Sequence, residues 1–429
     1  MASVRVYVKG FGCSSSIADA EVLAGCLGRA GHTLVGGSEM AEVLVYNTCA
    51  VKGPTENRMI SLLKKVSEGQ KLVVAGCLPL INFERLRREV SFDGVVGPAF
   101  GEGIVEVVEM VASGGRVVRL GGDLVRVPPV DLPRKRVNLR IGIVPISYGC
   151  LGSCSYCCVR FARGKLRSYG IRDVVGRVER DVAEGVREIW LTSQDTAAYG
   201  MDLGTCLPEL LEAVCGVEGE FFVRVGMMTV NNLLGFLDEL LEVFRDGKVF
   251  KFLHLPVQSG DDQVLKGMNR FYSRDDFVGV VEGFRRVFPW STVMTDVIVG
   301  FPGECEEAFK RSCRLVEEVK PDVVNVSKFF GRPGTAALDM ELQVDGLAVK
   351  GRSRVLSDLV RRVALECNRR WVGWRGRILV DEVGKGDCVV GRNSAYKPVV
   401  VAGARGLLGK FVSVEVVDAF QSYLKGEIV

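Results

Sequence analysis

Short apolar runs separated by turns and helical stretches mark the first part of the chain. The runs are Val4 to Val8, Val43 to Tyr46 and Leu72 to Ala75. Such runs are typical of buried strands, and their alternation with helical stretches indicates a parallel sheet covered by helices. We therefore expect residues 1–120 to form an open parallel α/β sheet domain.

A second region, residues 134–350, alternates strands and helical stretches over a greater length. Six strands with intervening helices predict a parallel, partial (β/α)6 barrel, with functional residues at the carboxyl ends of the strands. A stretch rich in Gly and Pro, Gly121 to Pro133, predicts the linker before it. The expected strands are Ile141–Ile146, Glu188–Leu191, Phe221–Val225, Phe252–Leu255, Val293–Val299 and Val323–Val326.

The last region, residues 371–429, has five short strand patterns separated by turns, which predict a small all-β barrel. Directly before it, Lys350 to Arg377 carries nine Lys or Arg residues against Asp358 and Glu366, with apolar residues near helical spacing. A solvated helix face is the alternative to a nucleic-acid contact for this basic segment. The expected strands are Arg377 to Val383, Asp387 to Arg392, Pro398 to Val401, Lys410 to Val417 and Tyr423 to Val429.

Three cysteines in a C-x3-C-x2-C array, Cys150, Cys154 and Cys157, follow the first strand of the expected barrel. Three thiolates can bind three irons of a [4Fe–4S] cube and leave the fourth iron open. An open iron suits the chelation of a substrate, which in radical chemistry is S-adenosylmethionine. The alternative is a structural zinc site, which needs a fourth Cys or His, and Cys158 is the local candidate.

Three further cysteines, Cys13, Cys49 and Cys77, each follow one of the apolar runs of the first domain. Neighbouring parallel strands deliver their carboxyl ends to one sheet edge, so these cysteines are expected to converge and hold a second cluster. Buried structural thiols are the alternative.

The amino-acid composition indicates the cellular compartment and the use of the cysteines. Fourteen cysteines without a recognisable secretory leader favour a reducing compartment and metal ligation over a disulfide framework. The chain has no apolar stretch of about 20 residues, so we expect a cytoplasmic protein without a membrane segment. The net charge of +4 decides little by itself.

The two cysteine sets stand inside longer motifs, and together these resemble the methylthiotransferases of the radical S-adenosylmethionine superfamily. Asn47 to Arg58, Gly76 to Pro79 and Arg163 to Ser168 carry the resemblance, which covers nearly the whole chain. Leu191 to Gly200 is similar to the archaeal and eukaryotic branch that acts on threonylcarbamoyl-adenosine in tRNA. The resemblance implies an N-terminal methylthiotransferase domain, a radical S-adenosylmethionine barrel and a C-terminal TRAM domain. The TRAM domain is an OB-like barrel that binds RNA.

For the C-terminal region, the resemblance gives the basic segment a role. Its Lys and Arg residues suit the attraction of tRNA phosphates. Trp371, Trp374 and Tyr396 lie nearby in the sequence and suit stacking on bases.

The resemblance also implies a reaction. The cluster on Cys150, Cys154 and Cys157 would cleave S-adenosylmethionine to a 5′-deoxyadenosyl radical. This radical would take the hydrogen from C2 of N6-threonylcarbamoyl-adenosine at position 37 of the anticodon loop. The second cluster would deliver sulfur, and a second S-adenosylmethionine the methyl group. An electron donor and a sulfur source of unknown identity complete the partners.

Other substrates and another class of protein stay open as alternatives. Within the family these are isopentenyl-adenosine in tRNA and an aspartate side chain of a ribosomal protein. Outside it, a non-catalytic iron–sulfur protein that binds RNA would need neither an open iron nor an adenosyl pocket.

By the same resemblance, residues at strand ends are expected to bind the cofactor and the substrate. Arg224 and Arg332 are the candidates for a cation that meets the threonyl carboxylate, although either could instead pair with an acidic neighbour. Arg224 could also meet the carboxylate of S-adenosylmethionine. His254 has the alternative of a hydrogen-bonded core histidine. The cofactor contacts are expected from Tyr156 and Gly300 at the adenine, from Ser193, Gln194 and Asp195 at the methionine amino group, and from His254, Gln258 and Ser259 at the ribose.

Overall fold

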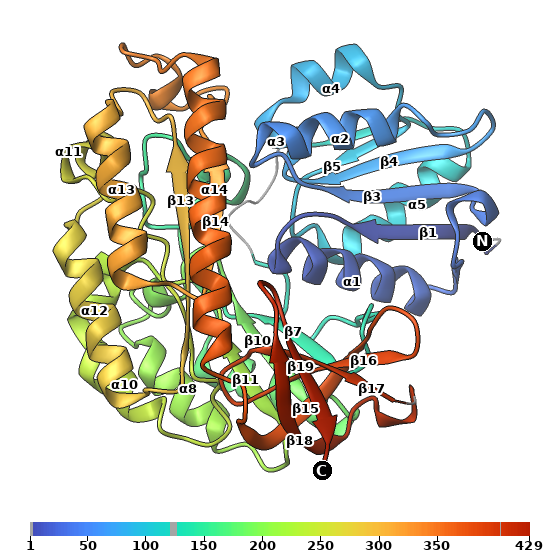
Figure 1. Cartoon of the computed structure of the whole chain (residues 1–429). Coiled ribbons are helices and arrows are strands. Elements are labelled where there is room, and N and C mark those ends of the chain that lie inside the picture. Colours follow the sequence, from blue (N-terminus) through green and yellow to red (C-terminus); the bar gives the residue numbers. More distant parts are fainter. Residues whose placement is uncertain (1–2, 121–126, 404) are drawn as a thin grey trace.

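The computed structural model describes residues 3–120, 127–403 and 405–429, and Figure 1 shows its arrangement. Its N-terminal part is a six-stranded parallel sheet of order β2-β1-β3-β4-β5-β6, as expected for an open α/β domain. Apolar side chains of β3 and β4 point to both faces, and helices cover both. The strands are β1 Arg5–Gly10, β2 Thr33–Leu34, β3 Val43–Thr48, β4 Lys71–Gly76, β5 Gly94–Val96 and β6 Val117–Arg119. The helices are α1 Ser14–Arg29, α2 Gly53–Leu63, α3 Leu78–Ile81, α4 Phe83–Glu89 and α5 Ile104–Ala112.

The central part is a partial barrel of two three-stranded parallel sheets, β7-β10-β11 and β12-β13-β14. An isolated parallel bridge links Val223 of β11 to Val249, three residues before β12 begins. Ile189 and Leu191 of β10 face the outer helices and are fully buried, whereas Trp190 faces the lumen beside Arg224. The strands are β7 Ile141–Pro145, β10 Glu188–Thr192, β11 Phe222–Val225, β12 Phe252–His254, β13 Thr292–Val299 and β14 Val323–Lys328. The principal outer helices are α7 Ile171–Ala183, α8 Leu207–Cys215, α10 Leu237–Val243, α12 Arg274–Val287, α13 Glu306–Val319 and α14 Gly346–Arg369.

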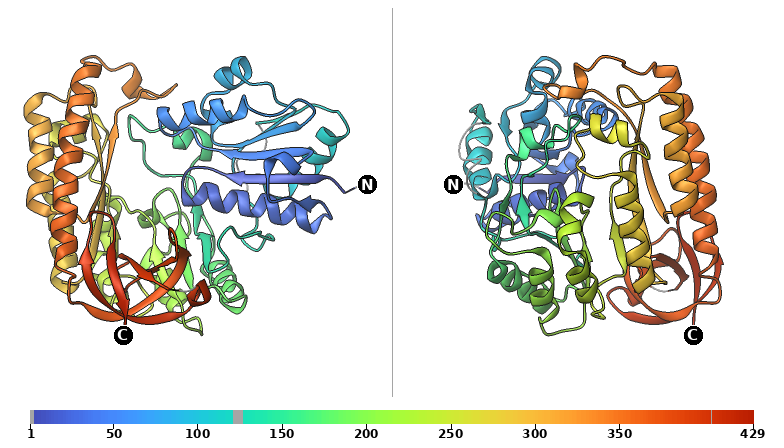
Figure 2. Two further views of the ribbon diagram at one scale, coloured as in Figure 1. Left: turned by 45° about the vertical axis from the view of Figure 1, so that its right-hand side comes forward. Right: turned by 90° about the vertical axis from the view of Figure 1, so that its left-hand side faces the viewer.

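The C-terminal part is a closed five-stranded barrel of order β15-β16-β17-β19-β18, which confirms the expected small all-β barrel. In both views of Figure 2 it lies at the lower end of the central barrel. Its core is built around Trp371, which is fully buried. The strands are β15 Arg375–Val383, β16 Cys388–Arg392, β17 Pro398–Ala402, β18 Phe411–Ala419 and β19 Leu424–Ile428.

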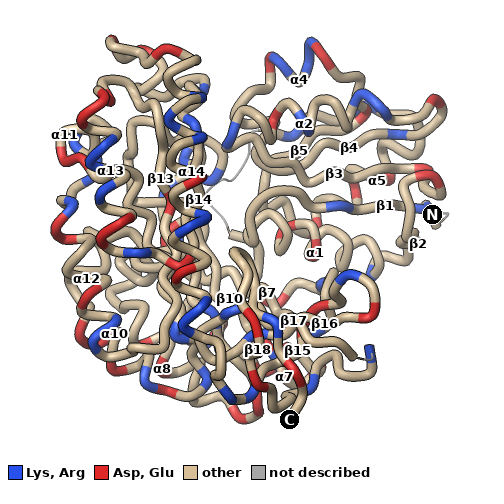
Figure 3. Tube along the Cα trace, in the orientation of Figure 1, with Lys and Arg blue, Asp and Glu red and all other residues tan. Residues whose placement is uncertain are grey.

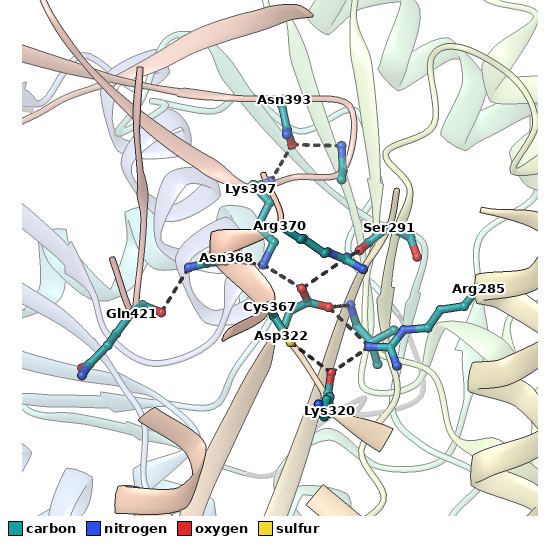
Figure 4. A network of polar contacts seen from close by, with 12 residues as sticks. Arg285, Ser291, Lys320, Asp322, Cys367, Asn368, Arg370, Asn393, Lys397 and Gln421 are labelled. Atoms are coloured by element: carbon teal, nitrogen blue, oxygen red, sulfur yellow. Dashed lines mark hydrogen bonds and ion pairs between the residues drawn. The ribbon is translucent and has the colours of Figure 1, made fainter. Parts of the chain in front are cut away.

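The C-terminal barrel is anchored to the amino-terminal ends of the central strands by the ionic network in Figure 4. Asp322, directly before β14, is completely buried. Its Oδ1 lies 2.8 Å from Nζ of Lys397 and 3.6 Å from Nη2 of Arg370. Lys397 Nζ also donates to Asn368 Oδ1 at 2.6 Å. Buried charges of this kind are stable only when paired, so the network holds the two barrels in one orientation.

Aromatic residues that we expected to stack on RNA bases fill this junction instead. Trp371 is fully buried and contacts Trp290 edge-on, with ring centroids 4.9 Å apart. The ring of Tyr396 lies 4.9 Å from that of Phe252, at the start of β12. Trp374 packs partly buried against the same core as Trp371. The expectation of base stacking is therefore wrong for Trp371 and Tyr396, because packing between the barrels leaves their faces covered.

The sheet domain contacts the other side of the central barrel through α1. Ala18 and Ile17 pack on Ile141 and Ile143 of the edge strand β7. Ser14 Oγ lies 2.6 Å from Oγ1 of Thr192, at the carboxyl end of β10. The carboxyl ends of β1 in the sheet domain and of β10 in the central barrel thus face one common boundary. Among the described helices, none is both long enough and apolar enough to cross a membrane.

Candidate metal centres and substrate site

The C-x3-C-x2-C loop follows β7 and gathers its three thiols. Burial, together with the nearby thiols of Cys150 and Cys154, raises the pKa of Cys157 to about 12. The backbone N–H of Gly152 donates to Cys150 Sγ at 3.3 Å. A Cβ on Gly152 would lie 3.3 Å from Cys150 Sγ and 3.7 Å from Cys154 Sγ. The loop therefore has a glycine where a side chain would crowd two of the thiols.

The three cysteines of the sheet domain also meet at one edge. Cys13 precedes α1, Cys49 follows β3 and Cys77 follows β4. Burial raises the pKa of Cys77 to about 12, and the proximity of Cys13 and Cys49 adds to the increase. Gly12, with φ of +106°, permits this approach, because a Cβ there would lie 2.5 Å from Cys49 Cβ.

The spacing of these thiols bears on the group they can hold. In residues 3–120, 127–403 and 405–429, no three His, Cys, Asp or Glu side chains are close enough to bind a single metal ion. A [4Fe–4S] cube is a larger ligand, since each thiolate contacts a different iron. The raised pKa values of Cys77 and Cys157 keep both thiols protonated at neutral pH, and bound iron would replace those protons.

Arg163, at the end of α6 (Val159–Arg163), supplies positive charge beside the second set of cysteines. Its charge lowers the pKa of both Cys49 and Cys77, against the larger effect of burial. Its Nη2 donates to Asp19 Oδ2 at 2.8 Å, whereas its buried Nη1 has no hydrogen-bond partner among the described residues. A buried N–H without a partner beside three thiols suits an anionic group, so this site fits a thiolate-bound iron–sulfur cluster.

Two of the residues expected at the adenine lie close together beside the first set of cysteines. The partly buried ring of Tyr156 contacts Phe301 edge-on, with centroids 6.5 Å apart, and its hydroxyl accepts from Arg270 Nη2 at 2.9 Å. Gly300 precedes Phe301, and its N–H donates to the Glu304 carboxylate. Val349 leaves no room for a side chain on Gly300, because a Cβ would lie 2.3 Å from Cγ2 of Val349.

The residues expected at the methionine amino group differ in whether they have a hydrogen-bond acceptor without a partner. The carboxylate of Asp195 accepts from Thr229 N at 2.9 Å and from Asn232 Nδ2 at 2.7 Å. Ser193 Oγ accepts from the N–H of Asp195. Gln194 Oε1 is buried without a partner among the described residues. Gln194 therefore offers a free acceptor, whereas Asp195 and Ser193 shape the loop.

His254 lies in a polar row along the lumen of the second half-barrel. Its Nε2 is 2.7 Å from Asp296 Oδ2, and Asn325 Nδ2 donates to Asp296 Oδ1 at 3.0 Å. Burial is the largest single influence on Asp296 and opposes its ionisation, but the contacts with His254, Asn325 and Lys52 together outweigh it and lower the pKa of that carboxyl. Ser259 is turned away from the lumen, since its Oγ lies 3.4 Å from Ser312 Oγ of α13. Gln258 adopts a left-handed conformation, with φ of +70°.

The two arginines expected at the substrate carboxylate lie apart and are both engaged. Arg332 forms a buried ion pair with Glu56 of α2, so the pairing with an acidic neighbour that the sequence left open is the one observed. The Arg224 guanidinium lies 5.2 Å from the ring centroids of Trp190, Phe252 and Tyr396. Arg224 therefore belongs to the aromatic junction with the C-terminal barrel.

A residue that sequence reasoning did not single out reaches the lumen from the sheet domain. Lys52 donates from Nζ to Ser327 Oγ of β14 at 2.7 Å. The next residue, Gly53, lies against the ring of Phe330, where a Cβ would be 2.6 Å from Cδ1. The signal was present, because Lys52 stands in the motif from Asn47 to Arg58.

Three family models match successive parts of the chain. The model described as "Uncharacterized protein family UPF0004" matches residues 5–97, "Radical SAM superfamily" matches 144–316, and "TRAM domain" matches 369–429. Among solved structures, the radical S-adenosylmethionine methyltransferase TsrM from Kitasatospora setae aligns with a TM-score of 0.59 at 13% identity. The alignment covers 79% of this chain and 77% of that one. At that identity the likeness concerns the fold.

Curated relatives match over nearly the full length of the chain. A protein from Pyrococcus horikoshii named "Probable threonylcarbamoyladenosine tRNA methylthiotransferase" is 40% identical over 99% of this chain and 100% of its own. A relative of the same name from Methanothermobacter thermautotrophicus is 42% identical over 99% of both chains. The Homo sapiens "Threonylcarbamoyladenosine tRNA methylthiotransferase" is 36% identical over 99% of this chain and 74% of its own.

Proposed function

Because the chain belongs to the threonylcarbamoyladenosine tRNA methylthiotransferase family, we propose that it replaces the hydrogen on C2 of N6-threonylcarbamoyl-adenosine with a methylthio group. We place this nucleoside at position 37 of the tRNA anticodon loop. The chain is a radical S-adenosylmethionine transferase that acts on tRNA and uses [4Fe–4S] chemistry. Action on tRNA also suits the cytoplasmic location that the sequence predicts.

The observation that carries the proposal is the meeting of two three-cysteine sites at one domain boundary. Cys158, next to Cys157, lies near enough to Cys49 for the charge of Cys49 to raise its pKa, although burial is the larger cause. In our proposal Cys150, Cys154 and Cys157 hold one cluster, and the sheet-domain cysteines hold the other. When bound, these clusters supply the electron that cleaves S-adenosylmethionine and the sulfur that reaches C2.

The chain's own residues hold and orient the reactants. Tyr156 and Gly300 form the adenine side of the pocket for S-adenosylmethionine, and Gln194 Oε1 accepts from its amino group. His254 and Gln258 face the ribose, whereas Ser193, Asp195 and Ser259 position the loops around them. General-base catalysis is not used at C2 of the adenine ring, because that aryl C–H is far too weak an acid for a side chain to deprotonate. In this proposal, residues 1–120 hold the sulfur-delivering cluster and residues 134–350 hold the cluster that cleaves S-adenosylmethionine. Residues 371–429 form the RNA-binding barrel.

Paired cysteine variants test the two-cluster arrangement. Anaerobically reconstituted protein should contain about eight irons, because each site holds four. Cys150→Ala should lose reductive cleavage of S-adenosylmethionine, whereas Cys49→Ala should keep cleavage and lose the methylthio product. Cys388→Ala, in the C-terminal barrel, is the matched control and should behave like the wild type. Methylthio product from Cys49→Ala at the wild-type rate would reject the division of roles.

The substrate is tested separately with two tRNAs that carry different nucleosides at position 37. Mass spectrometry should detect the methylthio product on threonylcarbamoyl-adenosine in preference to isopentenyl-adenosine. A preference for isopentenyl-adenosine, or indifference, would reject the substrate and leave the reaction class standing. A reduced protein that fails to cleave S-adenosylmethionine would instead favour the non-catalytic iron–sulfur protein.

A further inference from the structure

Lys52 projects from the second cysteine site toward the lumen of the barrel. It lies three residues after Cys49, directly before α2. Its Nζ donates to Ser327 Oγ at 2.7 Å, near the carboxyl end of β14. The ammonium group therefore crosses the boundary between the two domains at the end of the barrel where the cysteine loops lie.

The backbone that carries Lys52 is fixed by two contacts with the segment after β14. Gly53 lies against the ring of Phe330, which leaves no space for a side chain at that position. Glu56, on the first turn of α2, forms the buried ion pair with Arg332. These contacts hold the base of the Lys52 side chain in register with the end of β14, while the ammonium itself stays solvent-accessible.

Lys52 has no acidic partner in the described part of the chain. The ion pairs near it join other residues, such as Arg332 with Glu56 and His254 with Asp296. Ser327 is neutral. Asp296 lies near enough to feel the charge, but its two oxygens already bind His254 and Asn325. A protein cation that faces the barrel lumen without a carboxylate partner is suited to an anionic group of the substrate.

Three other cations near the lumen have contacts of their own. Arg332 is paired with Glu56, and Arg224 is enclosed by three aromatic rings. Arg270 donates to the hydroxyl of Tyr156. Lys52 differs from Arg332 and Arg224 because its partner is a neutral hydroxyl that a stronger acceptor can replace. It differs from Arg270 because its side chain is exposed, whereas the Arg270 guanidinium lies over the rings of Tyr156 and Tyr272.

We propose that Lys52 binds the carboxylate of the threonylcarbamoyl group and thereby selects this nucleoside over neutral N6 substituents, an inference that rests on the proposed function. The carboxylate takes the place of Ser327 Oγ as the acceptor from Nζ. An isopentenyl group has no charge to offer and leaves the ammonium with its neutral partner.

The test uses two synthetic anticodon stem–loops that differ by a single charge. One carries threonylcarbamoyl-adenosine, and the other carries its methyl ester, in which the carboxylate is neutral. Binding to reconstituted enzyme is measured by fluorescence anisotropy. The wild type should prefer the free acid by about tenfold, as expected for one charged contact. Lys52→Met should bind both RNAs equally, and Lys52→Arg should keep most of the preference.

Two controls separate this inference from its premise. Lys65→Met, a change at an exposed lysine just beyond α2, should keep the tenfold preference. Iron content establishes that each variant is assembled. A Lys52→Met enzyme that still prefers the free acid tenfold overturns the role of Lys52. A wild type that forms methylthio product on isopentenyl-adenosine alone overturns the proposed substrate, and this inference with it.

Discussion

Asp19 and Arg163 form an ion pair of 2.8 Å that is almost completely buried between the sheet domain and the barrel. Asp19 lies on α1, which follows Cys13, and Arg163 ends the helix that follows Cys157. Tyr148 completes the unit, since its hydroxyl donates to Asp19 Oδ1 at 2.8 Å. The pair thus links the segments after the two cysteine sites, and the position of one site depends on the other.

Removing one partner of the Asp19–Arg163 pair should lower the stability of the folded protein. Arg163→Met leaves the Asp19 carboxylate buried and unpaired, so we expect the free energy of unfolding to fall by about 3–5 kcal/mol. Denaturant unfolding measures the change. The double variant Arg163→Met with Asp19→Asn should recover part of the loss, because it removes both charges. Equal stability of the single variant and the wild type would contradict the role given to this pair.

The anchoring of the C-terminal barrel can be tested at Lys397. Lys397→Met removes the 2.8 Å ion pair with buried Asp322, and we expect the free energy of unfolding to fall by about 1.5–3 kcal/mol. Lys425→Met, an exposed change on the same barrel, should stay within about 0.5 kcal/mol of the wild type. If both variants behave alike, the ionic network does not hold the two barrels together.

The basic face of α14 allows a test of tRNA binding with variants that leave the protein core intact. Blue segments, which mark Lys and Arg, recur along this helix in Figure 3. Arg354, Arg362 and Arg369 are exposed and share one face of the helix. Changing all three to Gln should weaken tRNA binding and make its salt dependence shallower, by about 0.7–0.9 in log–log slope for each phosphate that the protein no longer neutralises.

Binding isotherms at several salt concentrations measure that slope. Arg245→Gln, at an exposed arginine just beyond α10 that pairs with Glu242, should leave the slope unchanged. If the triple variant keeps the wild-type slope, the tRNA backbone is bound elsewhere and α14 is a solvated face.

A pair of buried carboxyl groups predicts a pH effect on stability. Burial raises the pKa of Glu188, and burial together with Glu188 raises the pKa of Asp381 to about 8. The folded state then binds more protons than the unfolded state, whose Asp pKa is about 3.9. Stability from this pair is therefore present at low pH and lost as pH rises from about 4 to about 8.

The measurement is Tm against pH for three proteins. Asp381→Asn should flatten the decline between pH 5 and 8, because the amide does not titrate. Asp387→Asn, an exposed change on the same barrel, should keep the wild-type profile. A steeper decline in Asp381→Asn would show that another group governs the effect.

Local pattern was enough to predict most of the fold. The expected strand Val293–Val299 is β13, Thr292–Val299, and the expected strand Pro398 to Val401 is β17, Pro398–Ala402. Both strands are short, mainly apolar runs, and such a run is typical of a buried strand. The convergence of Cys13, Cys49 and Cys77 was also predictable, because parallel strands end at one edge.

Pairing over long sequence distance was not predictable in the same way. The partner of Arg332 is Glu56, and the partner of Asp322 is Lys397, in different domains. Nothing in the local pattern around either residue identifies its partner. Trp371 shows the same limit, since an aromatic residue near basic residues suits a core as well as a stacking surface.

The junction at Asp322 also bears on how this enzyme could be recombined. A domain boundary drawn near residue 371 cuts the sequence between Arg370 and Lys397, two cations that share one carboxylate. A grafted C-terminal barrel without counterparts of Lys397 and Tyr396 would leave Asp322 without one of these cations and Phe252 without the ring of Tyr396. A chimera therefore keeps this junction intact only if its C-terminal barrel carries residues that match Asp322 and Phe252 of the central barrel.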